Sequence, residues 1–284
     1  GVACALLEAT RSGRGQVVDA AMVDGTATLM AMFHAWPGWG ERGTNLLDTG
    51  APFYDTYECK DGAFISLGAL FFTVVVTQST LGTGVTRLLG GLAFCLGLVL
   101  VVVAGAELFT GNNLLAMAWA SGRIGTRAIL RNWALAYFGN VIGCLGTVAF
   151  VLWAGTATMA GSAVGATAIE IAKAKALLPP DEAFARGVLC NALVCLAVWL
   201  TLGGRTVSDK ILAILFPIAA FVTMGFEHSI ANWFFLPFGL ALDAGAVVPM
   251  AGAAWNLVWV TAGNIVGGTL LVAGVYWVAY LRKP

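Results

Sequence analysis

The chain has 284 residues, of which 59% are hydrophobic and 11% are charged, with 15 basic residues balancing 15 acidic ones. Its mean hydropathy of +0.86 is far too high for a soluble domain of this length. We therefore expect a protein of the lipid bilayer, with no nucleic-acid partner.

Residues 1–61 differ in composition from the rest of the chain and contain 12 of the 30 charged residues. The stretches "GRGQVVDAAMVDG" and "LDTGAPFYDTYECKDG" predict a strand that leads into a helix, followed by a hairpin-rich stretch. No basic region precedes an apolar core and a cleavage site, so we do not expect a signal peptide. We place a boundary near Asp61, between a short α/β-derived fragment (1–61) and a membrane domain (62–284).

Six membrane crossings are predicted in the second part, because about 20 apolar residues cross the hydrocarbon core. They lie near 62–80, 87–105, 130–154, 184–202, 208–242 and 255–282. The segment 208–242 is too long for one straight crossing, so we expect a break at 225–229. Residues 62–81 supply 20 uncharged positions, just enough for the first helix to span.

The loops on the two sides of the predicted membrane differ in basic residues. One side carries Arg123, Arg127, Arg131, Arg205, Lys210, Arg282 and Lys283, and the other carries Arg87, Lys173, Lys175 and Arg186. The positive-inside rule then predicts that both termini are cytoplasmic, in the inner (plasma) membrane.

Two sequence markers recur in the same order. "GAELFTGN" at 105–112 and "GFEHSIAN" at 225–232 share the pattern G-x-E-x-x-x-x-N, and "GNVIG" at 139–143 is repeated as "GNIVG" at 263–267. The pattern pairs Gly105 with Gly225, Glu107 with Glu227 and Asn112 with Asn232. With three crossings in each half, the second half must be inverted relative to the first. We expect an all-α, aquaporin-like arrangement with broken second and fifth helices.

Ionisable side chains are costly inside a membrane and normally face a partner or a cavity. Glu107 and Glu227 could therefore hold the helix breaks together by accepting hydrogen bonds from backbone or Asn groups, or could contact a substrate. We favour the structural role, with Gly105, Gly225 and Asn112 in the same breaks.

Cysteine and histidine do not indicate a metal or a cofactor. The six cysteines (Cys4, Cys59, Cys95, Cys144, Cys190 and Cys195) form no CxxC pair, and four lie in apolar segments, which favours packed thiols. His34 and His228 are the only histidines, too few for a metal cluster. Phosphate-binding loops are absent, which argues against an ATP-driven pump.

From Gly62 to Pro284 the sequence resembles the formate/nitrite transporter family. The resemblance rests on "AELFTGNNLLAMAWASGRI", "RNWALAYFGNVIG", "RGVLCNALVCLAVWL", "GFEHSIANWFFLPFG" and "GNIVGGTLLVAGVYWVAYLR". It implies a homopentameric channel, not an enzyme, that passes small monovalent anions and their conjugate acids. Formate or nitrite is the favoured substrate, with hydrosulfide, acetate and lactate as alternatives. A neutral-solute pore of the glycerol-facilitator type is a further alternative, but the paired NPA motifs are absent.

The same resemblance assigns roles to individual residues. It makes His228 the central pore histidine and Thr110 the hydroxyl at the second-helix break. Lys175 becomes the vestibule lysine, although Lys173 is an alternative. The remaining implied positions are the apolar constrictions (Phe94, Leu98, Leu108 and Phe221) and two polar pore neighbours (Asn191 and Asn232).

An apolar constriction excludes a bare anion, because desolvating a charge is far more costly than desolvating a neutral acid. Histidine, with a pKa near 6.5, is the side chain best suited to exchange a proton near neutral pH. His228 could therefore protonate the substrate, or could remain neutral and only orient it. A lysine near the mouth would raise the local anion concentration.

Residues 1–61 resemble an internal piece of the alpha-methylacyl-CoA racemases, within the type III CoA-transferase family, on "SGRGQVVDAAMVDG" and "RGTNLLDTGAPFYDTYECKDG". The family's catalytic histidine and aspartate would lie upstream, and Phe71 stands where its glutamate is expected, so we expect no activity from this fragment. The alternative function is a CoA-thioester-binding fragment on a membrane anchor. "DGAFISLGAL" fits both families; recombination, an assembly error or deliberate joining would each explain it.

Overall fold

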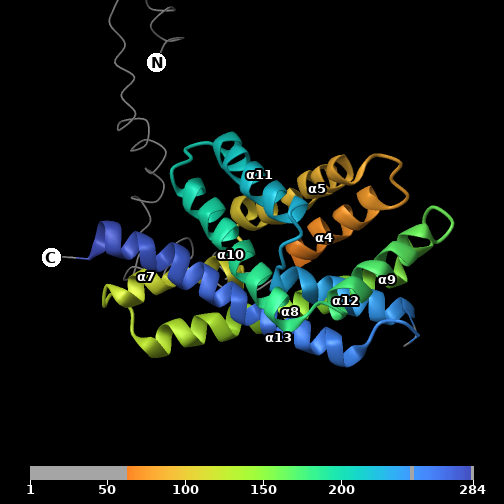
Figure 1. The fold of residues 1–284 in the computed structure, drawn as a ribbon. Coiled ribbons are helices and arrows are strands. Elements are labelled where there is room, and N and C mark those ends of the chain that lie inside the picture. Colours follow the sequence, from red (N-terminus) through yellow and green to blue (C-terminus); the bar gives the residue numbers. More distant parts are fainter. Residues whose placement is uncertain (1–62, 244–245, 283–284) are drawn as a thin grey trace, which may run out of the picture. The chain divides into compact units, whose positions relative to one another are not determined.

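The computed structural model describes residues 63–243 and 246–282, and every regular element in these ranges is helical (Figure 1). The elements in chain order are α4 (Ala63–Val76), α5 (Thr83–Ala104), α6 (Phe109–Asn112), α7 (Leu115–Ala120), α8 (Thr126–Trp153), η2 (Thr156–Thr158), α9 (Ala163–Ala176), α10 (Pro180–Leu202), α11 (Val207–Thr223), α12 (Ser229–Asp243), α13 (Met250–Val266), η3 (Gly267–Gly274) and η4 (Trp277–Leu281). The predicted N-terminal fragment, with Cys4, His34 and Cys59, lies outside the described residues.

Four helices are long and apolar enough to cross a membrane. They are α5, α8, α10 and the continuous helical stretch Met250–Leu281, which comprises α13, η3 and η4. This confirms the expectation of an α-helical membrane protein for the part of the chain described.

Two of the predicted crossings contain a change of direction. The helix α5 ends at Ala104 and α6 begins at Phe109, while α11 ends at Thr223 and α12 begins at Ser229. Gly105 (φ 81°) and Gly225 (φ 73°) have left-handed backbones, which glycine adopts without steric cost. In both places the next N–H, of Ala106 or Phe226, donates to the carbonyl five residues earlier, so the two helices end in the same motif.

The first helix ends earlier than predicted. We expected a crossing near 62–80, whereas α4 ends at Val76 and Gln78 has a positive φ of 50°. The polar run from Thr77 to Thr80 accounts for this, because hydroxyl side chains compete with the helical backbone for hydrogen bonds. The hydroxyl of Thr77 donates to the carbonyl of Thr73 at 2.8 Å.

Glycines bring α10 and α13 into backbone contact. A Cβ on Gly263 would lie 2.3 Å from the carbonyl oxygen of Phe184, and one on Gly267 would lie 2.1 Å from that of Val188. Small residues at such crossings allow close packing of membrane helices. Asn264 lies between these glycines and donates to the carbonyl of Gly187 at 2.8 Å, so the close crossing fixes its position.

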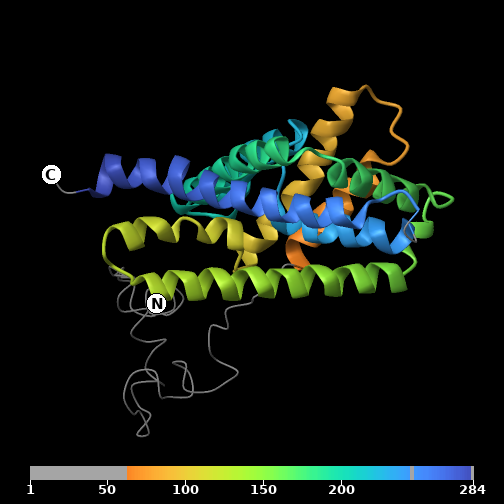
Figure 2. The same ribbon diagram turned by 60° about the horizontal axis from the view of Figure 1, so that its bottom comes forward.

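The helix α12 lies between α8 and α13 and packs against both (Figure 2). Phenylalanines of α12 fill the core there, with Phe234 and Phe238 fully buried. The opposite face of α8 is apolar and exposed, with Phe138, Ile142, Phe150 and Trp153 between 64% and 84% accessible. Such a face suits lipid or another subunit.

The cysteines that the structure describes, Cys95, Cys144, Cys190 and Cys195, are all buried. They are packed thiols in that part of the chain. Cys144 lies on α8 and its thiol donates to the carbonyl of Ile230 at 3.3 Å, which joins α8 to α12.

Candidate functional site

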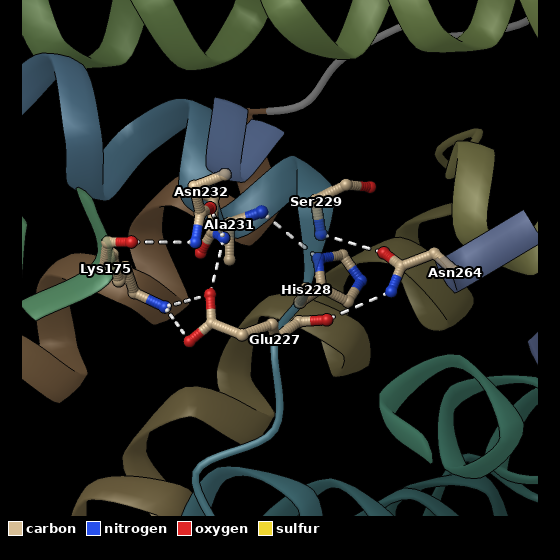
Figure 3. Close-up of polar contacts among 8 residues, drawn as sticks. Lys175, Glu227, His228, Ser229, Ala231, Asn232 and Asn264 are labelled. Atoms are coloured by element: carbon tan, nitrogen blue, oxygen red, sulfur yellow. Dashed lines mark hydrogen bonds and ion pairs between the residues drawn. The ribbon is translucent and has the colours of Figure 1, made fainter. Parts of the chain in front are cut away.

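His228 is buried in the interruption between α11 and α12. Its Nδ1 accepts a hydrogen bond from the backbone N–H of Ala231 at 3.1 Å (Figure 3). The imidazole thus caps the first turn of α12, as an N-cap side chain does. A ring nitrogen that accepts carries no proton, so the ring is neutral and its proton is on Nε2.

Nε2 of His228 lies 3.0 Å from Oγ1 of Thr110, so the ring donates to this hydroxyl. Thr110 is fully buried on α6, in the other break. Its carbonyl accepts from Nδ2 of Asn191 at 3.2 Å, and the same amide nitrogen donates to the carbonyl of Asn264 at 2.7 Å. Asn191 therefore joins the two breaks through α10.

Glu227 precedes the histidine and is held on two sides (Figure 3). Lys175 places Nζ 2.9 Å from both carboxylate oxygens, and Asn232 donates from Nδ2 at 2.7 Å. Asn232 also donates to Oδ1 of Asn256 at 2.7 Å, and Asn256 donates to the carbonyl of Lys175 at 3.0 Å. This closed ring fixes the carboxylate beside His228.

The first break has a matching arrangement. Asn112 donates to the carboxylate of Glu107 and to Oδ1 of Asn132, the latter at 2.9 Å. The pairs Glu107–Asn112 and Glu227–Asn232 thus have equivalent contacts, with Asn132 in the place of Asn256. The halves differ in charge, because only Glu227 of the two glutamates has an ion-pair partner in the described ranges.

A second asparagine ties each break to a neighbouring helix. Asn140 on α8 accepts from the N–H of Phe109 at 2.9 Å and donates to the carbonyl of Glu107 at 2.9 Å. Asn264 on α13 accepts from the N–H of Ser229 at 2.8 Å and donates to the carbonyl of Glu227 at 3.0 Å (Figure 3). Helix ends leave such backbone groups unpaired, and these amides satisfy them.

A cavity of about 230 Å³ lies on one side of His228. Phe94 and Phe221 line it, and their rings meet edge to face with centroids 5.7 Å apart. The Phe221 ring also lies 6.1 Å from that of His228. The remaining lining residues include three basic ones (Arg87, Lys175 and Arg186) and two of the polar ring (Glu227 and Asn232).

A second cavity, of about 430 Å³, is lined by Val101, Val102, Leu108 and Lys210 among others. The helix α5 lines both cavities, since Phe94 faces the first and Val101 the second. Seven residues separate these positions, or roughly 10 Å along the helix axis. Leu98 lies between them, is 1% exposed and lines neither cavity.

The two candidate lysines, Lys175 and Lys173, differ in whether they line the first cavity. Lys175 lies in the last turn of α9, lines the first cavity and bonds Glu227, whereas Lys173 does not line that cavity. The sequence suggested that both lysines lie in a loop. Both lie in α9 instead, because this helix continues to Ala176.

Residues 61–278 match the profile of the formate/nitrite transporter family. The chain belongs to this family. The formate channel FocA of Escherichia coli (strain K12) is 39% identical over 240 residues, covering 78% of this chain and 84% of that protein. The nitrite transporter NirC of Salmonella typhimurium is 33% identical over 225 residues, covering 77% and 80%.

Solved structures agree with this family assignment. A structure described as a pentameric formate channel with formate bound is 40% identical, with a TM-score of 0.70, and the match covers 78% of this transporter and 94% of that chain. An FNT family ion channel is 29% identical, with a TM-score of 0.72 and coverages of 84% and 93%. These relatives are channels and transporters, so the transporter is a membrane transport protein and not an enzyme.

The N-terminal resemblance is also confirmed at the family level. Residues 1–73 match CoA-transferase family III, and this match overlaps that of the transporter family over residues 61–73. The overlap includes all of "DGAFISLGAL" (61–70), the stretch that fits both families.

Sequence reasoning missed four asparagines of the transporter's polar network. Asn140 and Asn264 were inside the repeated "GN" marker, and Asn132 and Asn256 recur at the same offset of 124 residues. That shared offset could have identified all four asparagines from the sequence alone. Arg87, which lines the first cavity, was assigned only to a loop.

Proposed function

We propose that this chain is a channel for small monovalent anions and their conjugate acids, with formate or nitrite as the substrate. The relatives named as formate channels and a nitrite transporter support the substrate class. The observation that carries the proposal is the position of His228, buried against Thr110 and beside a cavity that Phe94 and Phe221 line. The substrate passes this histidine between two apolar constrictions.

The constrictions are formed by Phe94 and Phe221 toward the first cavity and by Leu98 and Leu108 toward the second. All four side chains are buried and apolar, at most 3% exposed. Such a barrier favours a neutral species, because an anion would lose its hydration without replacement. Formate and nitrite therefore cross the barrier in their acid forms.

The hydrogen bonds around His228 favour an orienting role over proton donation. In the neutral ring, Nε2 carries the only proton, and giving it away would leave an imidazolate. Proton donation requires prior protonation of Nδ1, which breaks the bond from the N–H of Ala231. We propose that the neutral ring donates a hydrogen bond from Nε2 to the substrate, in exchange for Thr110, and that the substrate takes up its proton from the hydronium of the bulk solution before it crosses the barrier.

The rest of the architecture follows from the same proposal. Residues 62–284 form the channel domain, with six crossings in two inverted repeats, and the equivalent hydrogen bonds at the two breaks support this symmetry. The glutamates and asparagines hold the breaks. Arg87 and Arg186 line one cavity and Lys210 the other, in keeping with opposite sides of an inner membrane and cytoplasmic termini. The exposed face of α8 and the pentameric relative support a homopentamer in the bilayer.

A second candidate function rests on the match of residues 1–73 to CoA-transferase family III. Residues 1–61 would bind a CoA thioester at the membrane surface. Equilibrium binding of acetyl-CoA to the full chain tests this, and binding that persists in the presence of excess formate would support it. We favour the channel, with residues 1–61 as a fragment without activity.

The deciding experiment measures formate and nitrite flux into proteoliposomes at about pH 5.5 and about pH 7.5, on either side of the ordinary histidine pKa. It compares the parent chain with His228→Asn. Asparagine is a good N-cap and retains an amide donor but cannot take up a proton. The variant therefore keeps the helix cap and removes titration, and its amide donor lies about one bond length short of the position of Nε2.

We expect flux in the parent and substantial flux in His228→Asn, with a similar pH dependence. A pH dependence that is present in the parent and lost in that variant, with normal insertion, would show that the histidine transfers a proton. An inserted parent that passes neither anion would contradict the proposed function.

A further inference from the structure

Three basic side chains line the cavity beside His228, and two of them are neutralised. Lys175 has its Nζ 2.9 Å from both oxygens of Glu227, with only 15% of its side chain exposed. Arg186 is 2.7 Å from a carboxylate oxygen of Glu182, one helical turn earlier. At each of these two positions an anion in the cavity therefore meets an ion pair, which carries little net positive charge.

Arg87 is the third of these residues, and its charge is not balanced by a nearby carboxylate. The two ion pairs found across the described ranges do not include it. Its Nη1 makes one long contact, 3.5 Å, to the carbonyl of Thr223. The remaining guanidinium donors have no hydrogen bond to the described residues, so they are available to a ligand.

The position of Arg87 directs it toward the pathway. It lies on α5 seven residues before Phe94, two turns along the same face of the helix. Its Nη1 also lies against Gly225, where a Cβ would be only 3.1 Å away. The guanidinium is thus located where α11 ends, in the lining of the same cavity as Phe94, Phe221 and His228.

We propose that Arg87 is the anion-capture residue of this channel and determines its preference for anions with two oxygens; this inference rests on the proposed function. A guanidinium binds carboxylate-like anions through two parallel hydrogen bonds, and both formate and nitrite present two oxygens in a suitable plane. From the sequence, Lys175 was the residue expected to attract anions. In the structure that lysine holds Glu227 in place.

Capture by an exposed arginine has a measurable signature. Its attraction for an anion falls with ionic strength, because the Debye length is about 10 Å at 0.1 M salt. It raises the local concentration of the anion without changing the barrier at the phenylalanines. Removing the charge therefore raises the substrate concentration for half-maximal flux and leaves the maximal flux unchanged.

The test measures formate flux against concentration in phosphatidylcholine vesicles, at low and high ionic strength, for the parent, Arg87→Gln and Arg87→Lys. The neutral lipid prevents the arginine from acting through anionic headgroups. The double variant Glu182→Gln, Arg186→Gln is the matched control, since it removes a paired cation together with its carboxylate and leaves the net charge unchanged. Hydrosulfide, whose charge lies on a single atom, is the comparison substrate.

For Arg87→Gln we expect the half-saturating formate concentration to rise roughly two- to fivefold at low ionic strength, and the difference to vanish at high salt. Arg87→Lys should restore hydrosulfide affinity fully but formate affinity only partly, because lysine lacks the planar fork. Unchanged formate affinity in Arg87→Gln, or an equal effect in the double variant Glu182→Gln, Arg186→Gln, would overturn the inference while leaving the channel function intact. A parent without flux would instead overturn the proposed function, and the inference with it.

Discussion

Asn140 and Asn264 make the same pair of hydrogen bonds in the two halves of the chain. Each accepts from a backbone N–H just after a helix break and donates to the carbonyl of the glutamate in that break. Replacing either by alanine leaves a backbone donor and acceptor unpaired, so we expect each variant to lose about 1–3 kcal/mol of unfolding free energy. Denaturant unfolding in detergent measures this.

Thr147→Ala is the control for that comparison, since it removes only a hydroxyl bonded to a carbonyl of the same helix. If Asn140→Ala and Asn264→Ala behaved like Thr147→Ala, the asparagines would not hold the breaks.

The two glutamates should respond differently to neutralisation. Glu227→Gln leaves the charge of Lys175 without its partner, and breaking a buried ion pair costs about 3–5 kcal/mol. Glu107→Gln removes a charge that has no ion-pair partner among the described residues, so we expect a smaller loss. Thermal unfolding ranks the two variants, and Lys175→Met in the Glu227→Gln background should recover stability.

The imidazole of His228 also caps α12. Substitutions at this position can therefore change stability and transport separately. His228→Ala removes the acceptor for the N–H of Ala231 and should cost about 1 kcal/mol of stability. His228→Asn should stay close to the parent. The midpoint of thermal unfolding distinguishes them; equal losses in both variants would show that the cap contributes nothing.

Gly105 and Gly225 form a matched pair for testing the breaks. Alanine at either position must adopt a left-handed backbone, at a cost of about 1–2 kcal/mol. A Cβ at Gly105 meets nothing within 4 Å, whereas one at Gly225 lies 3.1 Å from Nη1 of Arg87. We expect similar destabilisation but a raised half-saturating formate concentration only in Gly225→Ala, measured by concentration-dependent flux.

The stability of the protein should depend on pH through Asp209, which lies in the first turn of α11. The N–H and hydroxyl of Thr206, and the N–H of Arg205, hold the pKa of Asp209 below its ordinary value. A depressed pKa means that the carboxylate contributes stability above its unfolded pKa, near 4, and loses it as the pH falls through the lower folded value. The unfolding midpoint of Asp209→Asn should therefore lie below that of the parent near pH 7 and approach it near pH 3. A constant difference would rule out this linkage.

Much of the membrane domain was predictable from local sequence. The glycine, glutamate and asparagine of the repeated marker predicted breaks at residues that the structure leaves between helices, such as Gly225. The repeat could be read because both halves use the same backbone motif and the same amide contacts. The lengths of the apolar stretches predicted the long helices, because a helix needs about 20 apolar residues to cross the hydrocarbon core.

Other features depend on contacts that sequence does not encode locally. The pair Lys175–Glu227 joins residues 52 positions apart, and no local pattern indicates that a glutamate neutralises this lysine. That Arg87 has no ion-pair partner among the described residues depends on how the charges are arranged in three dimensions. The early end of α4 depends on hydroxyl groups that hydropathy counts only as mildly polar.

The helix α5 touches α11 at Gly91, where a Cβ would lie 2.8 Å from the carbonyl oxygen of Ala219. This contact can serve as a fulcrum. Phe94 is three residues beyond it and Val101 ten, or roughly 5 Å and 15 Å along the axis. A tilt of α5 about Gly91 would therefore displace the wall of the second cavity about three times as far as Phe94. A tilt small enough to leave the phenylalanines almost in place would therefore still change the width of the second cavity.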